Sequence, residues 1–232
     1  MGEEMYTSGK YLEKNPTWDI EDSPWKAKQI LKSIGNNRLK PHSICEVGCG
    51  AGEILNQLYL QMPTDVSFVG YEISPQAFEL CQQRNRDRLC FRLKNLLEDA
   101  NAYFDLVLAI DVFEHVEGYM DFLRKLRSKG LYKMFHIPLD LSVQTVLRSS
   151  PILHCRQKVG HIHYFTKETA IATLKDTGYE IVDFFYTASS IDLSAKSLNT
   201  LLARLPRKMM FKLNKDMAVR LLSGYSLMVL AK

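Results

Sequence analysis

The chain has 232 residues, of which 46% are hydrophobic and 24% are charged, and its formal net charge is +4. This composition is that of an ordinary globular protein, and the length fits one domain with a single core. No stretch approaches the ~20 apolar residues of a membrane span, and the N-terminus lacks the apolar core of a signal peptide, so we expect a cytoplasmic protein. The five cysteines form an odd set without a CxxC pair, which indicates reduced thiols and argues against a zinc site.

The first forty residues carry spaced aromatic side chains but little periodicity until Ser23 and Pro24 begin a helix. Two interpretations stay open for these aromatics. They anchor that helix to a sheet, or they fold over a bound ligand, where an aromatic face attracts a cation by about 0.5–2 kcal/mol. The residues concerned are Tyr6, Tyr11, Trp18 and Trp25.

The most informative segment runs from Ser43 to Gly52, where a buried strand leads into a glycine-rich turn and then a helix. Glycine has no Cβ, so such a turn brings backbone amides close to a ligand. A second apolar strand, at residues 66–71, ends in Glu72, and an acid there can accept hydrogen bonds from ribose hydroxyls. Together these features predict a pocket for an adenosine-containing cofactor.

The spacing of the glycines narrows the choice of cofactor. The chain has E-x-G-x-G-x-G beginning at Glu46, whereas nicotinamide and flavin sites use G-x-G-x-x-G. A carboxylate at that position repels a pyrophosphate and suits a cationic ligand that carries an amine and a sulfonium. A nicotinamide enzyme is therefore disfavoured.

Strands and helices alternate through most of the chain, which favours an α/β fold with a doubly wound, mostly parallel sheet. The later strands are expected at residues 89–93, 104–110, 131–137, 179–187 and 225–231. Helices are expected at residues 53–60, 75–81, 119–128 and 166–175, and over most of 188–223. Thr166 is expected to cap the fourth of these helices with help from Glu168.

The 36 residues at 188–223 are too many for a plain turn between two strands, and we expect them to form a helical cap. Pro206 is expected to divide the cap into two short helices. Residues 196–220 are both basic and apolar. This composition fits solvated helix faces or a lid over a lipophilic or acidic small molecule. It also fits a peripheral membrane contact or a surface that binds nucleic acid.

Three motifs in this order resemble the class I S-adenosylmethionine-dependent methyltransferases, in their small-molecule branch of types 11, 12 and 23. They are the glycine motif, FDLV at 104–107 with DVFEHV at 111–116, and HYFT at 163–166 with GYEI at 178–181. The resemblance implies a seven-stranded Rossmann-like sheet with an antiparallel last strand. It also implies an N-terminal lid at 1–40, a core domain at 41–187 plus 224–232, and an inserted cap at 188–223.

The resemblance further implies which residues bind S-adenosyl-L-methionine. Glu72 would take the ribose hydroxyls and Ile73 would pack against the adenine. Asn95 stands where the family usually has an aspartate that bonds the adenine amino group, and an asparagine carbonyl can still accept that bond. The other cofactor-binding residues implied are Tyr11, Trp18, Glu46, Gly48, Cys49, Gly50, Leu96, Ile110 and Asp111.

Methyl transfer is an in-line displacement, so alignment of the two partners does much of the catalysis, but a hydroxyl or ammonium acceptor also needs a base. The candidate bases are His115, His136, His161 and His163, with Asp111, Glu114 and Asp140 behind them. His161 and His163 would share a face of an extended segment, but the spacing nominates no third ligand, so no metal is expected. Residues 138–159 show no clear period and follow the fifth strand, where the family places substrate contacts.

We therefore expect a methyltransferase (EC 2.1.1.-) that acts on oxygen or nitrogen of a small molecule, without a stable protein partner. An RNA methyltransferase is one alternative, permitted by the basic C-terminal region. Against it, the chain has neither the N/D-P-P-Y/F motif of amino-methylating enzymes nor a paired-cysteine arrangement for carbon-5 chemistry. A binding protein without turnover is the other alternative, permitted by the unclear base and by Asn95.

Overall fold

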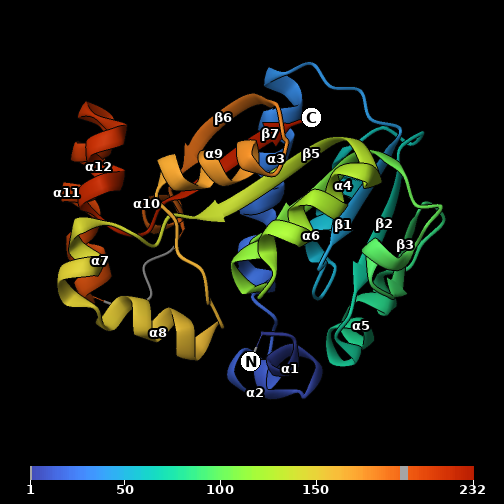
Figure 1. Ribbon diagram of the computed structural model, residues 1–232, viewed down its shortest axis with the longest axis horizontal. Coiled ribbons are helices and arrows are strands. Elements are labelled where there is room, and N and C mark those ends of the chain that lie inside the picture. The colour runs from blue at the N-terminus through green and yellow to red at the C-terminus, as the bar shows by residue number, and fades with distance from the viewer. Residues whose placement is uncertain (1, 194–197) are drawn as a thin grey trace.

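The computed structural model describes residues 2–193 and 198–232, and its centre is a seven-stranded sheet of order β3-β2-β1-β4-β5-β7-β6 (Figure 1). Strands β1 to β5 pair in parallel, and β7 is antiparallel to both β5 and β6. The expected doubly wound sheet with an antiparallel last strand is thereby confirmed. The strands are β1 (Ser43–Val47), β2 (Ser67–Glu72), β3 (Leu89–Leu93), β4 (Phe104–Ile110), β5 (Gly130–Pro138), β6 (Ile181–Thr187) and β7 (Ser226–Ala231).

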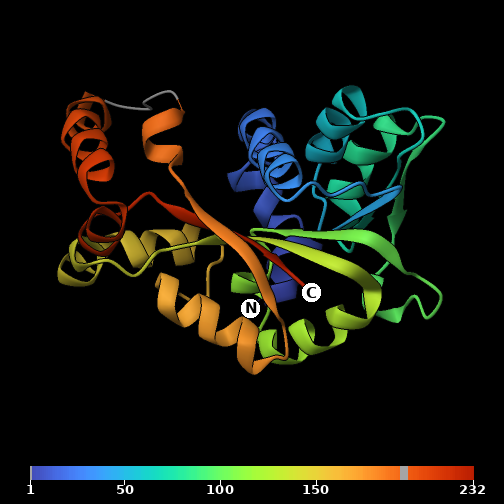
Figure 2. The same cartoon turned by 90° about the horizontal axis from the view of Figure 1, so that it is seen from above.

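Helices cover both faces of the sheet (Figure 2). One face packs against α3 (Ser23–Asn36), α4 (Glu53–Gln61) and α5 (Pro75–Cys81), and the other against α6 (Tyr119–Leu126) and α9 (Lys167–Asp176). The apolar run of β4 serves both layers. Leu106 and Leu108 belong to the first core, and Val107 and Ala109 belong to the second. A strand buried on both faces therefore reads as continuously apolar.

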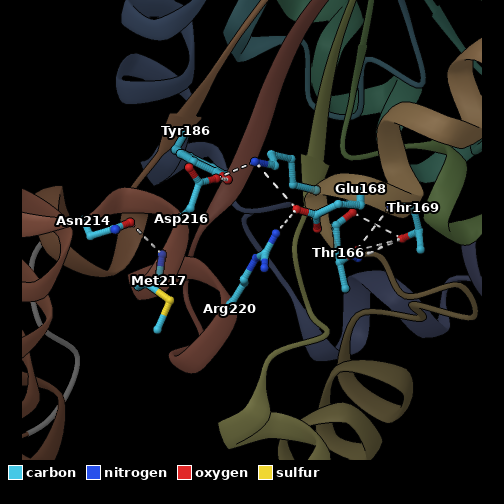
Figure 3. Close-up of polar contacts among 9 residues, drawn as sticks. Thr166, Glu168, Thr169, Tyr186, Asn214, Asp216, Met217 and Arg220 are labelled. Atoms are coloured by element: carbon cyan, nitrogen blue, oxygen red, sulfur yellow. Dashed lines mark hydrogen bonds and ion pairs between the residues drawn. The ribbon is translucent and has the colours of Figure 1, made fainter.

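Side-chain caps fix where several helices begin. The Ser74 hydroxyl accepts a hydrogen bond from the Ala77 amide and so starts α5. Thr166 caps α9 as predicted, but its partner in the capping box is Thr169 and not Glu168. Glu168 instead accepts a hydrogen bond from Arg220 of α12 (Lys215–Leu221), because its side chain points outward from the first turn (Figure 3).

The late helices lie at one end of the molecule (Figures 1 and 2). They are α7 (Val143–Arg148), α8 (Ser150–Lys158), α10 (Ser189–Asp192), α11 (Leu198–Leu213) and α12. The prediction that Pro206 divides the cap was wrong, because α11 continues through Pro206 and the break comes at Asn214. Met210 and Phe211, after the proline, pack against the core and stabilise a helix that loses only one backbone hydrogen bond there.

Residues 138–159, which show no periodicity in the sequence, form α7 and α8. Ser142 and Thr145 make a capping box that starts α7, and Pro151 stands in the first turn of α8. These local signals determine the two helices although neither has a continuous apolar stripe. Among the described residues, no helix is long and apolar enough to cross a membrane.

The N-terminal segment folds as two short helices, α1 (Gly2–Thr7) and α2 (Lys10–Lys14), next to the end of α8 (Figure 1). The Tyr6 hydroxyl donates to the Val159 carbonyl at 2.8 Å, and Lys14 Nζ donates to the Gln157 carbonyl at 2.8 Å. The segment thus spans from the carboxyl edge of the sheet to the late helices.

Candidate active site

The glycine-rich turn after β1 adopts a backbone that side chains do not tolerate. Gly48, Gly50 and Gly52 all have positive φ, at 65°, 54° and 75°. A Cβ on Gly50 would lie 2.6 Å from the ring of Trp18. The turn therefore packs closely against an aromatic ring, and the amides of Gly48, Cys49 and Gly50 donate to oxygens within the protein.

Glu72, at the end of β2, is buried and holds the turn. Its Oε2 accepts from the Gly50 amide at 2.7 Å, and its Oε1 accepts from the amides of Ile73 and Ser74 at 2.8 and 2.9 Å. Burial raises the pKa of Glu72, and the three amide bonds oppose that rise. A carboxylate offers about four lone-pair positions, so one remains for a ligand hydroxyl.

Glu46, on β1, is almost fully buried, and within the part of the chain that the structure describes its Oε2 has no hydrogen-bond partner. Burial raises the pKa of this carboxyl well above its usual range, although the nearby Lys26 cation lowers it. An unpartnered carboxylate oxygen is costly to bury. Its position indicates a place for a hydrogen-bond donor or a cation supplied by a ligand.

A cavity of about 800 Å³ opens over the carboxyl ends of β1, β2 and β4. This is where ligands bind in open α/β sheets, and its volume is typical of small-molecule sites. All twelve residues implied as cofactor-binding line it, together with three of the four candidate histidines. The twelve are Tyr11, Trp18, Glu46, Gly48, Cys49, Gly50, Glu72, Ile73, Asn95, Leu96, Ile110 and Asp111.

The N-terminal aromatics form one wall of this cavity. The ring centroids of Tyr11 and Trp18 are 4.7 Å apart, and those of Tyr6 and Tyr11 are 4.9 Å apart. The Tyr11 hydroxyl donates to Asp19 at 3.0 Å, and both Trp18 and Asp19 have positive φ. Such a backbone persists only where surrounding contacts hold it, and here the aromatic contacts do so.

Asp111, just after β4, contacts both Lys26 and His136, which belong to no common sequence motif. Its carboxylate is 2.7 Å from Lys26 Nζ and 2.6 Å from His136 Nδ1. Burial raises the pKa of Asp111, but the charges of His136 and Lys26 outweigh it and hold the pKa far below its usual range. His136 Nε2 bonds the Thr187 hydroxyl at 2.8 Å, so both ring nitrogens of His136 are engaged within the protein.

A second polar cluster contains Glu114, His115 and His161. His161 Nδ1 is 2.6 Å from Asp140 Oδ2, and His115 Nδ1 is 2.8 Å from the Tyr6 hydroxyl. The rings of the two histidines meet edge to face with centroids 4.8 Å apart. Backbone bonds from the amides at 162 and 163 to the Glu114 carbonyl keep the two segments together.

Burial dominates the ionisation of this cluster. It raises the pKa of Glu114 to about 8 and lowers that of His115 to about 4. Burial also lowers the pKa of His161, but the hydrogen bond to Asp140 and the charge of Glu114 outweigh it, and the net shift is upward. Both carboxylate oxygens of Glu114 lack a hydrogen-bond partner.

His163 does not line the cavity. Its Nε2 bonds the Val116 carbonyl at 2.9 Å, and its ring packs on Tyr119 with centroids 4.4 Å apart. The expectation that His161 and His163 present the same face to a substrate is therefore not met. Sequence reasoning also missed Lys26 and Thr187 as neighbours of the site, since each comes from a segment distant in sequence from its partner.

Residues 21–183 match the model of the Methyltransf_23 family, a methyltransferase domain. The chain belongs to this family. It is also 27% identical over 158 residues to the cyclopropane-fatty-acyl-phospholipid synthase of Escherichia coli K12, a match that covers 59% of this chain and 40% of that protein. The chain thus spans about two fifths of the length of that curated relative.

Solved structures share the fold of this methyltransferase. The plantazolicin methyltransferase in complex with a monoazolic desmethylPZN analogue and SAH has a TM-score of 0.62 at 15% identity, covering 99% of this chain and 92% of that one. The Haloferax volcanii putative methyltransferase, solved as a complex with the Trm112 methyltransferase activator, has a TM-score of 0.59 at 12% identity. That match covers 82% of this chain and 81% of that one.

The cofactor of the family, S-adenosyl-L-methionine, fits the residues present. It carries an ammonium and a sulfonium, and the unpartnered carboxylate of Glu46 and the aromatic wall at Trp18 suit such charges. Glu72 keeps one acceptor position for the ribose hydroxyls. These groups suit the ammonium, the sulfonium and the ribose of this cofactor.

Proposed function

We propose that the protein transfers a methyl group from S-adenosyl-L-methionine to an oxygen or nitrogen atom of a small molecule. One observation carries the proposal. A single cavity of about 800 Å³ is lined both by the glycine turn with Glu72 and by two histidines, His115 and His161. The cofactor supplies a methyl group on a positively charged sulfur, and a second molecule must approach that methyl group from the opposite side.

We propose that Glu46, Gly48, Cys49 and Gly50 hold the methionine part and the ribose, with Glu72 on the ribose hydroxyls. The support is the unpartnered Glu46 oxygen and the Glu72 carboxylate bonded to the Gly50 amide at 2.7 Å. Further proposed contacts are to the adenine and the methionine portion. They involve Tyr11, Trp18, Ile73, Asn95, Leu96, Ile110 and Asp111.

Of the four candidate histidines, His115 and His161 are our proposed contacts for the acceptor. Each has one ring nitrogen bonded to a protein oxygen, and each side chain lines the cavity. His136 has both ring nitrogens engaged, and we assign it the task of orienting Asp111. A hydroxyl acceptor loses its proton as an oxygen lone pair bonds the methyl carbon, whereas an ammonium acceptor must first lose a proton to have a lone pair. In both cases the carbon–sulfur bond breaks with its electron pair on sulfur.

The helices between core strands β6 and β7, which are α10, α11 and α12, are our proposed cap over the acceptor part of the cavity, and α7 and α8, which precede β6, adjoin it. Ser189, Cys155 and Val159 line the cavity from this side. The Trp25 ring Nε1 donates to Asp192 of α10 at 3.1 Å, which connects the cap to α3. Lys167 and Tyr186 both donate to Asp216 of α12 (Figure 3).

The test is a search for product. The purified protein is incubated with S-adenosylmethionine and a panel of small hydroxylated and aminated acceptors, and S-adenosylhomocysteine is quantified by mass spectrometry. Transfer RNA serves as the comparison acceptor, because the basic C-terminal region left that class open. Product formed with a small acceptor supports the proposal, whereas product formed with RNA alone contradicts it.

We also propose that the cap touches an anionic membrane surface. Leu205, Met209 and Leu213 follow one another at intervals of four on α11 and are all exposed, with Leu213 at 84%. The exposed Lys208 and Lys212 flank them, which is the pattern of an interfacial amphipathic helix. The E. coli relative, whose name denotes a phospholipid product, is consistent with acceptors of amphiphilic character.

A further inference from the structure

Two histidines that line the cavity, His115 and His161, converge with the buried Glu114 beside it, without a direct bond between the three groups. One ligand atom each from Glu114, His115 and His161 lies within 4.8 Å of the other two. The distance from Glu114 Oε1 to His115 Nε2 is 3.9 Å, longer than a hydrogen bond. Glu114 is 1% exposed, and neither of its carboxylate oxygens has a hydrogen-bond partner among residues 2–193 and 198–232. The groups are spaced as if around a further atom.

The hydrogen-bond network orients both imidazoles toward this point. The Tyr6 hydroxyl has one proton, which it donates to the Val159 carbonyl. The bond between Tyr6 and His115 then requires Nδ1 of His115 to donate, which leaves a lone pair on Nε2. In the same way, Nδ1 of His161 donates to the Asp140 carboxylate and frees Nε2.

Metal-binding histidines have this environment. Such a histidine almost always donates its second ring N–H to a carboxylate or another oxygen, which fixes the tautomer and makes the free nitrogen more basic. His161 has a carboxylate partner at 2.6 Å and His115 a hydroxyl partner at 2.8 Å. Two imidazoles and one carboxylate are a common ligand set for first-row divalent cations, with a position left open for a further ligand.

We propose that Glu114, His115 and His161 bind a divalent transition-metal ion of the Zn²⁺ class. The ligand atoms of such an ion lie about 3.3 Å apart, so the three side chains must approach one another by up to about 1.5 Å. The sequence suggested no metal because His161 and His163, the pair considered there, lacked a third ligand. The fold supplies it from the turn after β4, in the DVFEHV motif.

The ion would act as a Lewis acid. An acceptor oxygen in its open position would lose its proton more readily at neutral pH. This role rests on the proposed methyl transfer, whereas binding of the ion does not. The metal proposal and the proposed methyl transfer can therefore be contradicted separately. The experiment measures metal binding and S-adenosylhomocysteine binding on the same sample.

A neighbouring set of residues provides the competing site. Asp140, Cys155 and His161 also offer ligand atoms within 4.8 Å of one another. In that set, however, the Asp140–His161 contact is already a hydrogen bond at 2.6 Å, so the nitrogen facing Asp140 carries a proton. Variants of Glu114 and Cys155 distinguish the two sets.

The experiment uses the full chain, freed of metal with a chelator and titrated with Zn²⁺ against a chromophoric competitor. We expect one ion per chain, an affinity at least 100-fold lower in Glu114→Gln, and a change below twofold in Cys155→Ser. Asp140→Asn should lower the affinity about 10- to 100-fold, because it removes the partner that orients His161. Binding of S-adenosylhomocysteine by each variant checks that it is folded.

The wild-type protein also gives an answer without any variant. Co²⁺ bound by imidazole and carboxylate gives visible ligand-field bands without the near-ultraviolet charge-transfer band of a cobalt–thiolate bond. A thiolate band, equal Zn²⁺ affinity in Glu114→Gln, or loss of binding in Cys155→Ser would each overturn the assignment. So would wild-type protein that binds S-adenosylhomocysteine but no stoichiometric metal. Failure to bind S-adenosylhomocysteine would instead count against the proposed function.

Discussion

The cavity has two parts that the chain builds in different ways. The proposed cofactor part is lined largely by β1, β2 and the turns that follow them. The proposed acceptor part is lined by side chains from α1, the turn after β4 and the segment before α9. The first is determined by local sequence, and the second exists only when distant segments meet.

The largest expected effect separates two histidines only two residues apart. His161→Asn should lower turnover about 100-fold or more with the first acceptor that screening yields, because this side chain reaches the acceptor part of the cavity. His163→Asn is the matched control. Its ring bonds the Val116 carbonyl, which an asparagine amide can also do, so turnover should change less than threefold. Equal losses of turnover in His161→Asn and His163→Asn would contradict the proposal that only His161 contacts the acceptor.

The next effect concerns the cofactor part. Gly50→Ala places a Cβ 2.6 Å from Trp18 at a φ of 54°, which should weaken S-adenosylhomocysteine binding about 30-fold, equivalent to about 2 kcal/mol. Calorimetry measures the affinity. Gly35→Ala is the control, since its Cβ meets nothing within 4 Å, and its affinity should equal that of the wild type. Unchanged binding by Gly50→Ala would show that the turn is not the binding surface.

The third effect is a dependence of stability on pH. The pKa of Asp111 is lowered in the folded state by His136 and Lys26, so its contribution is present above the unfolded pKa of about 4 and is lost as pH falls toward the folded pKa. Asp111→Asn should lower the free energy of unfolding by about 2 kcal/mol at pH 7 and by much less near pH 2. Urea titrations across this range measure the difference. A constant difference would contradict the charge-based account.

The smallest effect tests the proposed membrane surface. Lys212→Gln should weaken binding to vesicles of anionic phospholipid about fivefold, because one lysine near such a surface contributes about 1 kcal/mol. Lys175→Gln, at the exposed end of α9, is the control. Sedimentation with anionic and with neutral vesicles measures both. No binding to anionic vesicles by the wild type would remove the proposal.

Most of the fold could be predicted because its signals are local. The strands, the glycine turn, the Ser74 cap and the Thr166 cap all depend on neighbouring residues, and the family match agrees with them. The predictions from sequence failed where tertiary contacts determine the secondary structure. Packing of Met210 and Phe211 carries α11 past Pro206, and two capping signals form α7 and α8 without an apolar stripe.

The acceptor part could be predicted only as a set of candidates. The order of residues in the chain does not show that Tyr6 meets His115, or that Asp140 meets His161. Nor does it show that His163 bonds a backbone carbonyl while His161, two residues earlier, reaches the cavity. Glu114 stood out in the DVFEHV motif, but its two unpartnered oxygens are visible only in the fold.

The central claim is that the glycine turn and Glu72 bind S-adenosylmethionine. The most direct test is a calorimetric titration of S-adenosylhomocysteine into the wild type and Glu72→Ala, with NADH as the control ligand and thermal melting as the check on folding. We predict micromolar binding, at least tenfold weaker binding in the variant, and no heat from NADH. Binding of NADH alone, or equal affinity in a folded Glu72→Ala variant, would contradict the account.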